Sequence, residues 1–410
     1  MYPPPVLTPE KAKRRILLAL AGRTLPSERT PLEKALGRAL SASLVAQDDL
    51  PPFAASTMDG YAVRSADATS GGIRLPVRFQ VFAGGRPPSL RAGECCLITT
   101  GAPLPRGADA VEKQEEVRRD GRYAVFRRAV SAGQFVRARG SDLAAGEVAL
   151  EAGTLLDPAA TGLAAALGHR HVLVHRRPRV VILPTGDELV RPGRHLRPGQ
   201  IRESNGVALV AAVREAGGEA RALPAARDEE GSLSRALRSA EGADVLLTVG
   251  GVSVGERDLV RAALRRAGAR LSFWRVAIRP GKPFTFGFWG RTVVFGLPGN
   301  PASALVTFEL FVRPALRALS GLGGDGRVWT WVRLKESQDK PAELSVYLRV
   351  RLLVPPAVPG LPLAEPLRTQ RSGDLTSLAG ADALAVLPAG RGRYRKGAAV
   401  RAVLLRPARS

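Results

Sequence analysis

The sequence predicts a multidomain α/β protein, in which a doubly wound, mostly parallel sheet domain is joined to a helical arm, a β-rich domain and a small C-terminal β domain. The first observation is length, because 410 residues, 45% of them hydrophobic, provide several cores when one domain usually takes about 100–200 residues. The second is a regular alternation of strand-like and helix-like segments after Pro178. The third is a series of short apolar segments between glycine-containing turns on both sides of that region, which is typical of β domains.

The N-terminal segment, up to about Leu44, is predicted to be a helical arm. Thr8 precedes Pro9 and Glu10 in the arrangement of a helix N-terminus, and residues 31–44 carry apolar side chains at helical spacing. A further helix-like segment at 157–168 could return to pack on this arm. We therefore expect a discontinuous helical and linker domain formed by residues 1–45 and 144–177.

Two regions are expected to be rich in β-strands. Residues 46–143 contain short apolar segments at 75–82, 94–100 and 122–130, separated by turns. After Gly321–Gly324 the chain returns to short segments rich in Val, Leu, Pro and Gly, which predicts a C-terminal β domain over residues 327–410.

Residues 178–326 are expected to form the α/β domain. Strand-like segments at 179–183, 219–225 and 244–249 alternate with helix-like segments at 206–218, 231–242 and 257–268, and two more strands at 273–278 and 292–296 precede a helix over 301–319. This order predicts a doubly wound sheet with right-handed crossovers.

The loops that follow the predicted strands should meet, because ligands bind beyond the carboxyl ends of the strands in an open parallel sheet. Each of these loops carries glycine, proline, a carboxylate or a cation. They are 184–189 (PTGDEL), 226–230 (ARDEE), 250–258 (GGVSVGERD), 279–283 (RPGKP) and 297–301 (LPGNP).

Glycine-rich turns before helices let backbone N–H groups approach a phosphate, although a purely structural turn is the alternative for any one of them. On this ground we predict that Gly250, Gly251, Ser253, Gly255, Gly299 and Asn300 bind the ligand. Thr185, Gly186 and Asp187, in the loop after the first strand, are also predicted to bind it.

Four carboxylates, Asp187, Glu188, Asp228 and Asp258, would share this edge with Arg279 and Lys282. Like charges repel, and Mg²⁺ usually takes one or two carboxylates together with phosphate oxygens. We therefore predict Mg²⁺-assisted chemistry on a phosphorylated ligand, with Glu188, Asp228 and Asp258 as metal ligands. Acidic helix-capping residues in surface loops are the alternative.

The sequence lacks the characteristic motifs of several other classes of enzyme. The sequence contains no GxxxxGK[ST] loop, and no GxGxxG opens a first βαβ unit. The net charge of +24 raises the possibility of nucleic acid, but aromatic residues are only 5% and the basic residues are spread along the chain. We expect anionic small ligands instead of nucleic acid.

No apolar segment approaches the roughly 20 residues of a membrane helix, so we expect a cytoplasmic protein without a membrane partner. Adjacent Cys95 and Cys96 cannot readily bridge each other and are expected to be structural. His169, His171 and His175 could suggest a metal site, but their alternation is more typical of an exposed strand.

These motifs resemble those of the molybdopterin molybdenumtransferase (MoeA) family, to which the E domain of gephyrin is related. The resemblance covers nearly the whole chain in the family's order. Its marks are 51–64 (PPFAASTMDGYAVR), 99–115 (TTGAPLPRGADAVEKQE), 136–142 (VRARGSD), 184–189, 202–206 (RESNG), 250–258, 279–287 (RPGKPFTFG) and 297–309 (LPGNPASALVTFE).

The resemblance implies molybdenum cofactor biosynthesis, in which molybdate is inserted into the dithiolene of adenylylated molybdopterin and AMP leaves, with Mg²⁺ as the cofactor. It also implies an elongated two-fold homodimer and contact with other cofactor-assembly proteins. Segment 370–377 (QRSGDLTS) resembles the family's substrate-gripping segment and adds Ser372 and Ser377. The functional residues carried over by position elsewhere are Asp59, Thr100, Asp142, Glu188, Asp228, Asp258, Arg275, Arg279, Lys282, Pro298 and Pro301.

The chain departs from the family pattern at a few positions. Ala54 and Ala55 stand where the family usually has Asp-Asn, and Arg275 and Arg279 stand where lysines are common, which exchanges a compact charge for a planar fork. No carboxylate is lost, so we expect activity.

Three alternatives remain at this stage. They are a noncatalytic pterin-binding scaffold, an enzyme of the related adenylyltransferase type and a tungsten-inserting variant. The retained carboxylates argue against the first, and the MDGYA and TGAPLP segments favour the longer transferase over the second.

Overall fold

The computed structural model describes residues 6–251, 259–353 and 360–406, which form two compact units. The first unit comprises Met1–Arg29, Gly37–Ser41 and Leu173–Ser410, and the second comprises Thr30–Leu36 and Ala42–Val172. Each unit has a hydrophobic core of its own.

The first unit contains the predicted doubly wound, mostly parallel sheet. Its strand order is β16-β13-β17-β21-β20-β18, in which β20 runs antiparallel to both of its neighbours and the other neighbouring pairs are parallel. The strands are β13 (Arg179–Pro184), β16 (Glu219–Ala222), β17 (Val245–Val249), β18 (Arg270–Arg275), β20 (Pro283–Trp289) and β21 (Thr292–Leu297).

Strand β20 was not among the predicted strands. Phe284 and Phe286 of this strand are buried, and each ring contacts both Phe273 of β18 and Phe295 of β21. Pro283 and the glycine and threonine between the phenylalanines gave this segment a turn-like composition, and tertiary packing of the aromatic rings outweighs that local preference.

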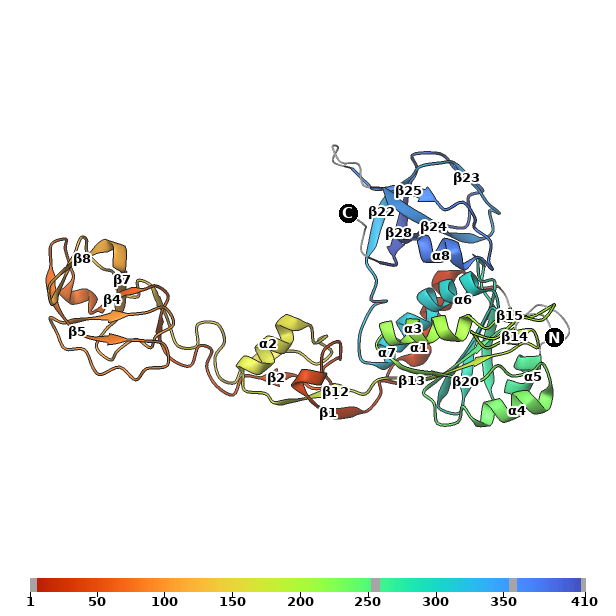
Figure 1. The fold of residues 1–410 in the computed structure, drawn as a ribbon, viewed down its shortest axis with the longest axis horizontal. Helices are drawn as coiled ribbons and strands as arrows, with labels where there is room; N and C mark the ends of the chain where they lie inside the picture. Colours follow the sequence, from red (N-terminus) through yellow and green to blue (C-terminus); the bar gives the residue numbers. More distant parts are fainter. Residues whose placement is uncertain (1–5, 252–258, 354–359, 407–410) are drawn as a thin grey trace. The chain divides into compact units, whose positions relative to one another are not determined.

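Helices cover both faces of the sheet (Figure 1). The residues of β13 alternate between the faces: Val180 and Ile182 join one core, whereas Val181 and Leu183 join the other. Strands buried on both faces are apolar throughout, which explains the RVVIL pattern. One face packs on α1 (Pro9–Leu20), α3 (Asn205–Glu215) and the continuous helix α6 (Pro301–Thr307), η4 (Phe308–Val312) and α7 (Arg313–Leu319), and the other packs on α4 (Glu230–Arg238) and α5 (Leu259–Arg266).

The predicted helix start at Thr8 is confirmed, because Lys11 N donates to Thr8 Oγ1 at 3.3 Å and Pro9 occupies the first helical turn. The predicted helix over 31–44 is wrong. Gly37 has a φ of +74°, and Ser41 N donates to Leu173 O at 3.0 Å, so backbone pairing replaces a helical ladder. The segment forms β1 (Ser27–Pro31), the short turn η1 (Leu32–Lys34) and β2 (Leu44–Val45), with β12 (His171–His175) as the strand beside Leu40.

The C-terminal segment is β-rich, as predicted. Its sheet has the order β19-β24-β25-β22-β28-β26, with β24 also pairing with β26. The elements are β19 (Ile278–Arg279), β22 (Trp329–Leu334), β23 (Gln338–Asp339), β24 (Ser345–Leu353), β25 (Leu363–Pro366), α8 (Leu375–Gly380), β26 (Ala383–Leu387), β27 (Arg393–Tyr394) and β28 (Ala399–Leu404). Because β19 precedes β20 in the chain and pairs with β24, the RPGKP segment lies beside this sheet.

The second unit is built on a sheet of order β7-β4-β6-β5-β9-β8. Strands β5, β6 and β9 confirm the segments predicted at 75–82, 94–100 and 122–130, and α2 confirms the helix predicted at 157–168. The elements are β3 (Ala55–Ser56), β4 (Gly60–Val63), η2 (Ser65–Asp67), β5 (Arg74–Val81), β6 (Cys95–Ile98), β7 (Ala110–Lys113), η3 (Gln114–Glu116), β8 (Val117–Asp120), β9 (Tyr123–Phe126), β10 (Val136–Arg137), β11 (Val148–Leu150) and α2 (Pro158–Ala166).

Both cysteines are buried in β6, and burial raises the pKa of each thiol to about 12. They are therefore protonated at neutral pH and act as small core residues.

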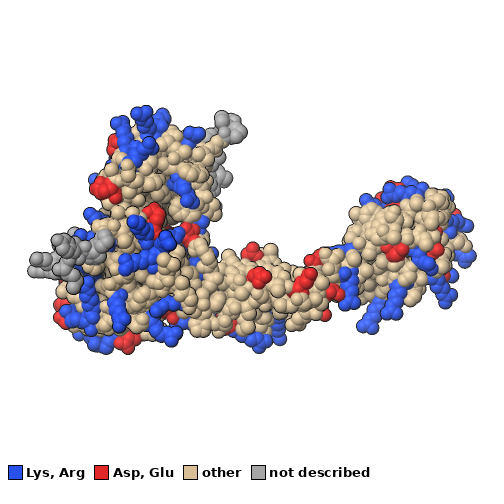
Figure 2. All heavy atoms as spheres, turned by 180° about the vertical axis from the view of Figure 1, so that it is seen from behind, with Lys and Arg blue, Asp and Glu red and all other residues tan. Residues whose placement is uncertain are grey.

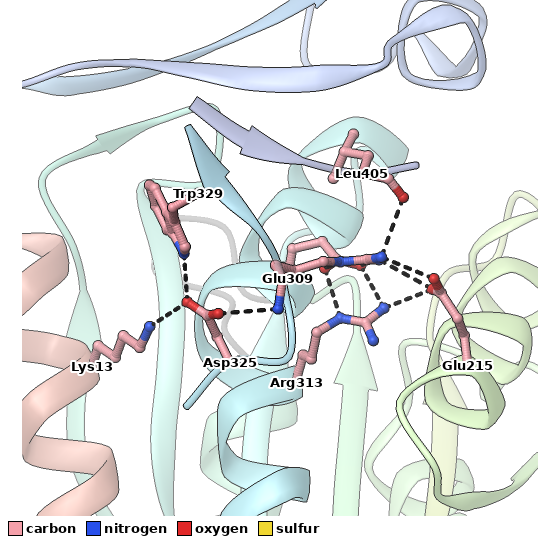
Figure 3. A network of polar contacts seen from close by, with 8 residues as sticks. Lys13, Glu215, Glu309, Arg313, Asp325, Trp329 and Leu405 are labelled. Atoms are coloured by element: carbon pink, nitrogen blue, oxygen red, sulfur yellow. Dashed lines mark hydrogen bonds and ion pairs between the residues drawn. The ribbon is translucent and has the colours of Figure 1, made fainter. Parts of the chain in front are cut away.

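An ion network holds the segment between α7 and β22 against the helices of the first unit (Figure 3). Arg313, which is 4% exposed, contacts Glu309 at 2.7 Å and Glu215 at 2.6 Å. Arg327 contacts the same two glutamates at 2.9 Å. Asp325 binds Lys13 of α1 at 2.9 Å, and Trp329 Nε1 donates to Asp325 at 2.9 Å. We call these six charged residues the linker ion network.

The helices of the described residues are all too short or too polar to cross a membrane. On the face drawn in Figure 2, Lys and Arg occur over both units, in agreement with their spread along the sequence.

Candidate active site

The candidate site lies at the carboxyl edge of the sheet in the first unit, where hydrogen bonds continue from the strands into the loops that follow them. Thr185 N donates to Val249 O at 2.9 Å. Gly250 N, one residue further along, donates to Leu297 O at 3.2 Å. These bonds join the ends of β13, β17 and β21. Loops that are far apart in the sequence meet because parallel strands end at the same edge.

Glycines let these loops approach one another. Gly250 has a φ of +92°, and a Cβ there would lie 2.6 Å from the carbonyl oxygen of Thr185. A Cβ on Gly299 would lie 3.3 Å from the Cα of Gly250. The three loops are therefore in direct backbone contact, which any larger residue at position 250 would prevent.

The loops line a cleft of 410 Å³ in the first unit. Strands β14 (Leu189–Val190) and β15 (Ile201–Arg202) contribute to it together with the start of α3. It brings together ten of the predicted site residues, namely Thr185, Gly186, Glu188, Asp228, Gly250, Gly251, Pro298, Gly299, Asn300 and Pro301.

Two carboxylates, Glu188 and Asp228, line the cleft, and Asp187 lies next to them. Asp228 N donates to Asp187 Oδ1 at 3.3 Å. The Glu188 carboxylate folds over Gly186, whose Cβ would lie 2.6 Å from Glu188 Oε2. Burial, followed by the negative charges of Asp187 and Glu188, raises the pKa of Asp228. Among the described residues, no Lys or Arg forms an ion pair with any of the three.

This carboxylate set fits a small divalent cation that shares its coordination with a substrate. Within residues 6–251, 259–353 and 360–406, no group of three His, Cys, Asp or Glu side chains is arranged to hold a metal alone. Mg²⁺ needs no such group, because it usually binds one or two carboxylates, phosphate oxygens and water. Glu188 and Asp228 line the cleft and would be the two carboxylates, and the negative charges of Asp187 and Glu188 add to the effect of burial in raising the pKa of Asp228.

Two basic residues, Arg279 and Lys282, lie between the start of β19 and the start of β20. Pro283 lines the cleft, and the side chains of Arg279 and Lys282, just before it, are exposed. Nε of Arg275 is buried without a hydrogen-bond partner among the described residues. None of the three lines the cleft itself.

Arg349 in β24 was missed by the sequence analysis. It is 0% exposed, and its Nε and Nη1 have no hydrogen-bond partner in the described part of the chain. Its Nη2 donates to Arg371 O at 3.1 Å. Burial lowers the pKa of Arg349, which Asp374 partly offsets and Arg279 lowers further. A buried guanidinium with unpaired N–H groups is unfavourable, which makes Arg349 a candidate partner for an anion. Only the buried position in β24 distinguishes Arg349 from the other 60 basic residues.

Ser372 connects the cleft to the C-terminal β sheet. Asn300 Nδ2 donates to Ser372 Oγ at 2.9 Å, and Ser372 O accepts from Ala302 N at 3.0 Å. Ser377 does not line the cleft; its hydroxyl donates to Asp374 O at 3.0 Å within α8's first turn.

Three predicted residues, Asp59, Thr100 and Asp142, belong to the second unit. Asp59 accepts hydrogen bonds from Thr100 N at 2.7 Å and from Thr100 Oγ1 at 3.0 Å. These two bonds lower the pKa of Asp59. Asp142 pairs with Arg137. All three predicted side chains are exposed.

Ser253, Gly255 and Asp258 lie outside the described residues. The cleft also contains residues to which the sequence analysis assigned no role: Arg202, Glu203, Ser204 and Asn205. These are the RESN of the RESNG segment, and their position just before α3 at the same sheet edge is the signal that could have identified them.

Comparisons with known proteins cover nearly the whole chain. The family models described as "MoeA N-terminal region (domain I and II)", "Probable molybdopterin binding domain" and "MoeA C-terminal region (domain IV)" match residues 7–168, 181–318 and 332–405. The chain is 36% identical to the molybdopterin molybdenumtransferase of Synechococcus elongatus over 94% of its own length and 96% of that protein. It is 34% identical to that of Bacillus subtilis, covering 98% of this chain and 94% of the relative.

A solved structure supports the same relationship. The crystal structure of the molybdopterin biosynthesis MoeA protein from Pyrococcus horikoshii is similar with a TM-score of 0.81 at 34% identity, over 98% of this chain and 99% of that one.

Proposed function

Because this chain belongs to the MoeA family of molybdopterin molybdenumtransferases, we propose that it inserts molybdenum from molybdate into the dithiolene of adenylylated molybdopterin and releases AMP. The observation that carries this proposal is the cleft of 410 Å³, which is lined by glycine-rich strand ends and by two carboxylates. Such a cleft suits a phosphorylated ligand together with a cation.

In this proposal the glycine loops hold the phosphate part of the substrate. The absence of side chains at Gly250, Gly251 and Gly299 leaves their backbone open to the cleft. Backbone N–H groups at such turns attract anions without needing a flexible charged side chain. Thr185, Gly186, Asp187, Pro298, Asn300 and Pro301 would shape the surrounding wall, together with Ser253 and Gly255.

The carboxylates would serve the metal. Glu188 and Asp228, with Asp258, would hold Mg²⁺, which when bound supplies positive charge that offsets the charge developing on the leaving phosphate. The chain's own contribution is to hold Glu188 and Asp228 close together at the cleft. Because the surroundings of Asp228 raise its pKa and so disfavour its ionised form, a bound cation would favour ionisation of this carboxylate.

The basic cluster would receive anions. Arg275, Arg279, Lys282 and the buried Arg349 would supply the positive charge, and Arg349 donates to the carbonyl of Arg371, next to Ser372. Molybdate and the pterin phosphate are both oxyanions. Guanidinium groups bind oxyanions through paired N–H donors. The family resemblance also assigns functional roles to Asp59, Thr100 and Asp142.

We further propose that the protein works as a homodimer in the cytoplasm. The family resemblance supports both statements. Sedimentation equilibrium of the purified chain should give twice its monomer mass of 43.4 kDa, and a monomer at micromolar concentration would exclude the dimer.

The test of the proposed function is reconstitution from purified components. We expect AMP release when the protein is incubated with adenylylated molybdopterin, molybdate and Mg²⁺, and no release when molybdate or Mg²⁺ is omitted. Release that ignores both omissions would contradict the proposal.

A further inference from the structure

Asn205, the first residue of α3, reaches across the cleft to the loop that follows β21. Its Nδ2 donates to Gly299 O at 2.7 Å, and both residues line the cleft. An amide that donates to a backbone carbonyl fixes the direction of that peptide group. This hydrogen bond therefore connects the RESNG and LPGNP segments. The sequence analysis assigned no role to Asn205 and did not predict this contact.

The Gly299 peptide, which accepts the hydrogen bond from Asn205, lies in contact with the other loops that line the cleft. Gly299 packs on Gly250, which in turn packs on Thr185. On its other side, Asn300 donates to Ser372 Oγ at 2.9 Å. The bond from Asn205 thus ties the last of three touching loops to the start of α3.

The position of the Asn205 backbone is fixed in its turn. Gly206 N donates its hydrogen bond to Glu203 Oε1 at 2.6 Å. A Cβ at Gly206 would lie 2.8 Å from Glu203 Oε2 and 3.3 Å from Pro184 Cγ. The start of α3 is therefore packed tightly against the end of β13, so the Asn205 side chain projects from a rigid base.

We propose that Asn205 is a positioning residue for the molybdenum-insertion reaction. Its amide N–H holds the Gly299 carbonyl, and through it the backbone of Gly299 and Asn300, in the orientation that receives the phosphate of the substrate. This inference rests on the proposed function, because it assigns Asn205 a role at the same cleft.

The decisive variant is Asn205→Asp, because it exchanges the donor for a group whose donor state depends on pH. An ionised carboxylate cannot donate to the Gly299 carbonyl and repels it, whereas a protonated carboxyl can donate its O–H. The rate of AMP release by Asn205→Asp, divided by that of the wild type at each pH, should rise as the pH falls from about 8 to about 5. The ordinary pKa of Asp is about 3.9, and repulsion from the carbonyl moves it upward.

Asn205→Ala removes the donor at every pH. We expect kcat to fall about tenfold, with a smaller change in KM and no pH dependence of the ratio to wild type, because one hydrogen bond is lost. Gln200→Glu is the matched control. It adds the same charge five positions away, and the Oε1 of Gln200, which accepts from Arg197 N at 3.0 Å, is replaced by a carboxylate oxygen that can accept the same bond. Its ratio to wild type should stay flat and near one.

A second measurement does not depend on activity. Amide hydrogen exchange of a peptide that covers residues 297–303 should be faster in Asn205→Ala than in the wild type, while exchange in the β24 strand stays unchanged. If the wild type releases no AMP, the proposed function fails, and the exchange measurement still decides whether Asn205 holds this loop. A flat Asn205→Asp ratio in an active protein, or unchanged exchange at 297–303, overturns the positioning role.

Discussion

At the scale of single residues, Asp228 combines a predicted role in the reaction with an unfavourable effect on stability. Its pKa is raised by burial and by the neighbouring Asp187 and Glu188. A carboxyl whose pKa is higher in the folded than in the unfolded state makes a favourable contribution to stability that is fully present below the unfolded pKa and is lost as the pH rises through the folded pKa. Ionised Asp228 therefore destabilises the fold at neutral pH, but only slightly, because the residue is exposed and solvent screens its charge.

Asp228→Asn should separate the two effects. Without divalent cations, its melting temperature at neutral pH should equal or exceed that of the wild type, while AMP release slows by about tenfold or more because a charge that supports the cation is lost. Glu230→Gln is the matched control, since Glu230 lies nearby but outside the cleft and its side chain is 65% exposed. It should alter neither quantity. A variant that melts earlier and loses activity in parallel would argue for a merely structural Asp228.

The raised pKa of Asp228 also predicts how the Mg²⁺ requirement varies with pH. Protons and Mg²⁺ compete for the same carboxylate, and a higher pKa brings this competition nearer to neutral pH. The Mg²⁺ concentration for half-maximal AMP release should therefore rise as the pH falls from about 7 to about 5. The Asp228→Asn variant should show a weaker dependence. An identical slope in both proteins would remove Asp228 from the metal site.

A substitution at Gly250 tests whether the site needs the close approach of the loops after β13 and β17. Gly250→Ala should reduce both AMP release and stability, because the position has a φ of +92° and the new Cβ would lie 2.6 Å from Thr185 O. Gly242→Ala is a matched control, with a φ of +77° but no atom within 4 Å of the new Cβ. The control should cost only the backbone strain of about 1–2 kcal/mol. Equal losses of unfolding free energy and full activity in both variants would show that the contact at Gly250 is unimportant.

At the scale of elements, the linker ion network joins α1, α3, η4 and α7 to the segment that leads into β22. Arg313→Ala would leave the partly buried Glu309, which is 11% exposed, with Arg327 as its one remaining ionic partner among the described residues. The free energy of unfolding should fall by about 1–3 kcal/mol. Arg333→Ala, at an exposed site in β22, should change it by less than about 0.5 kcal/mol. Urea titrations of the two variants give the comparison, and equal midpoints would contradict a stabilising network.

The elements that could be predicted from the sequence are those whose local pattern and tertiary environment agree. Strands β13 and β17 are continuous apolar segments, and α4 carries Leu233 and Leu237 toward one core. The pattern failed at 31–44, where helical spacing was overruled by Gly37 and by pairing with β12. It failed again at β20, because this strand is stabilised by packing of its buried phenylalanines against other strands of the sheet, which the local sequence does not reveal.

At the scale of the whole molecule, the candidate site could be predicted to the extent that topology determines it. Strand direction alone implies that the loops at Thr185, Gly250 and Gly299 meet, and the structure brings them into contact. Arg349 and Asn205 could not be assigned in this way, because their significance lies in burial and in a single cross-loop hydrogen bond. The roles of all the predicted site residues stay predictions, both those that line the cleft and Asp59, Thr100, Asp142, Ser253, Gly255 and Asp258, and so do the domain limits.

The most direct test of the proposed reaction is the ratio of AMP released to molybdenum inserted in a single turnover. Excess protein would be mixed with a limiting amount of adenylylated molybdopterin, molybdate and Mg²⁺, and both products would be quantified from the same quenched samples. Insertion coupled to release predicts one AMP for each molybdenum atom incorporated, with the same time course for both. AMP that appears without incorporated molybdenum, or molybdenum that is incorporated while the adenylylated substrate stays intact, would contradict the account.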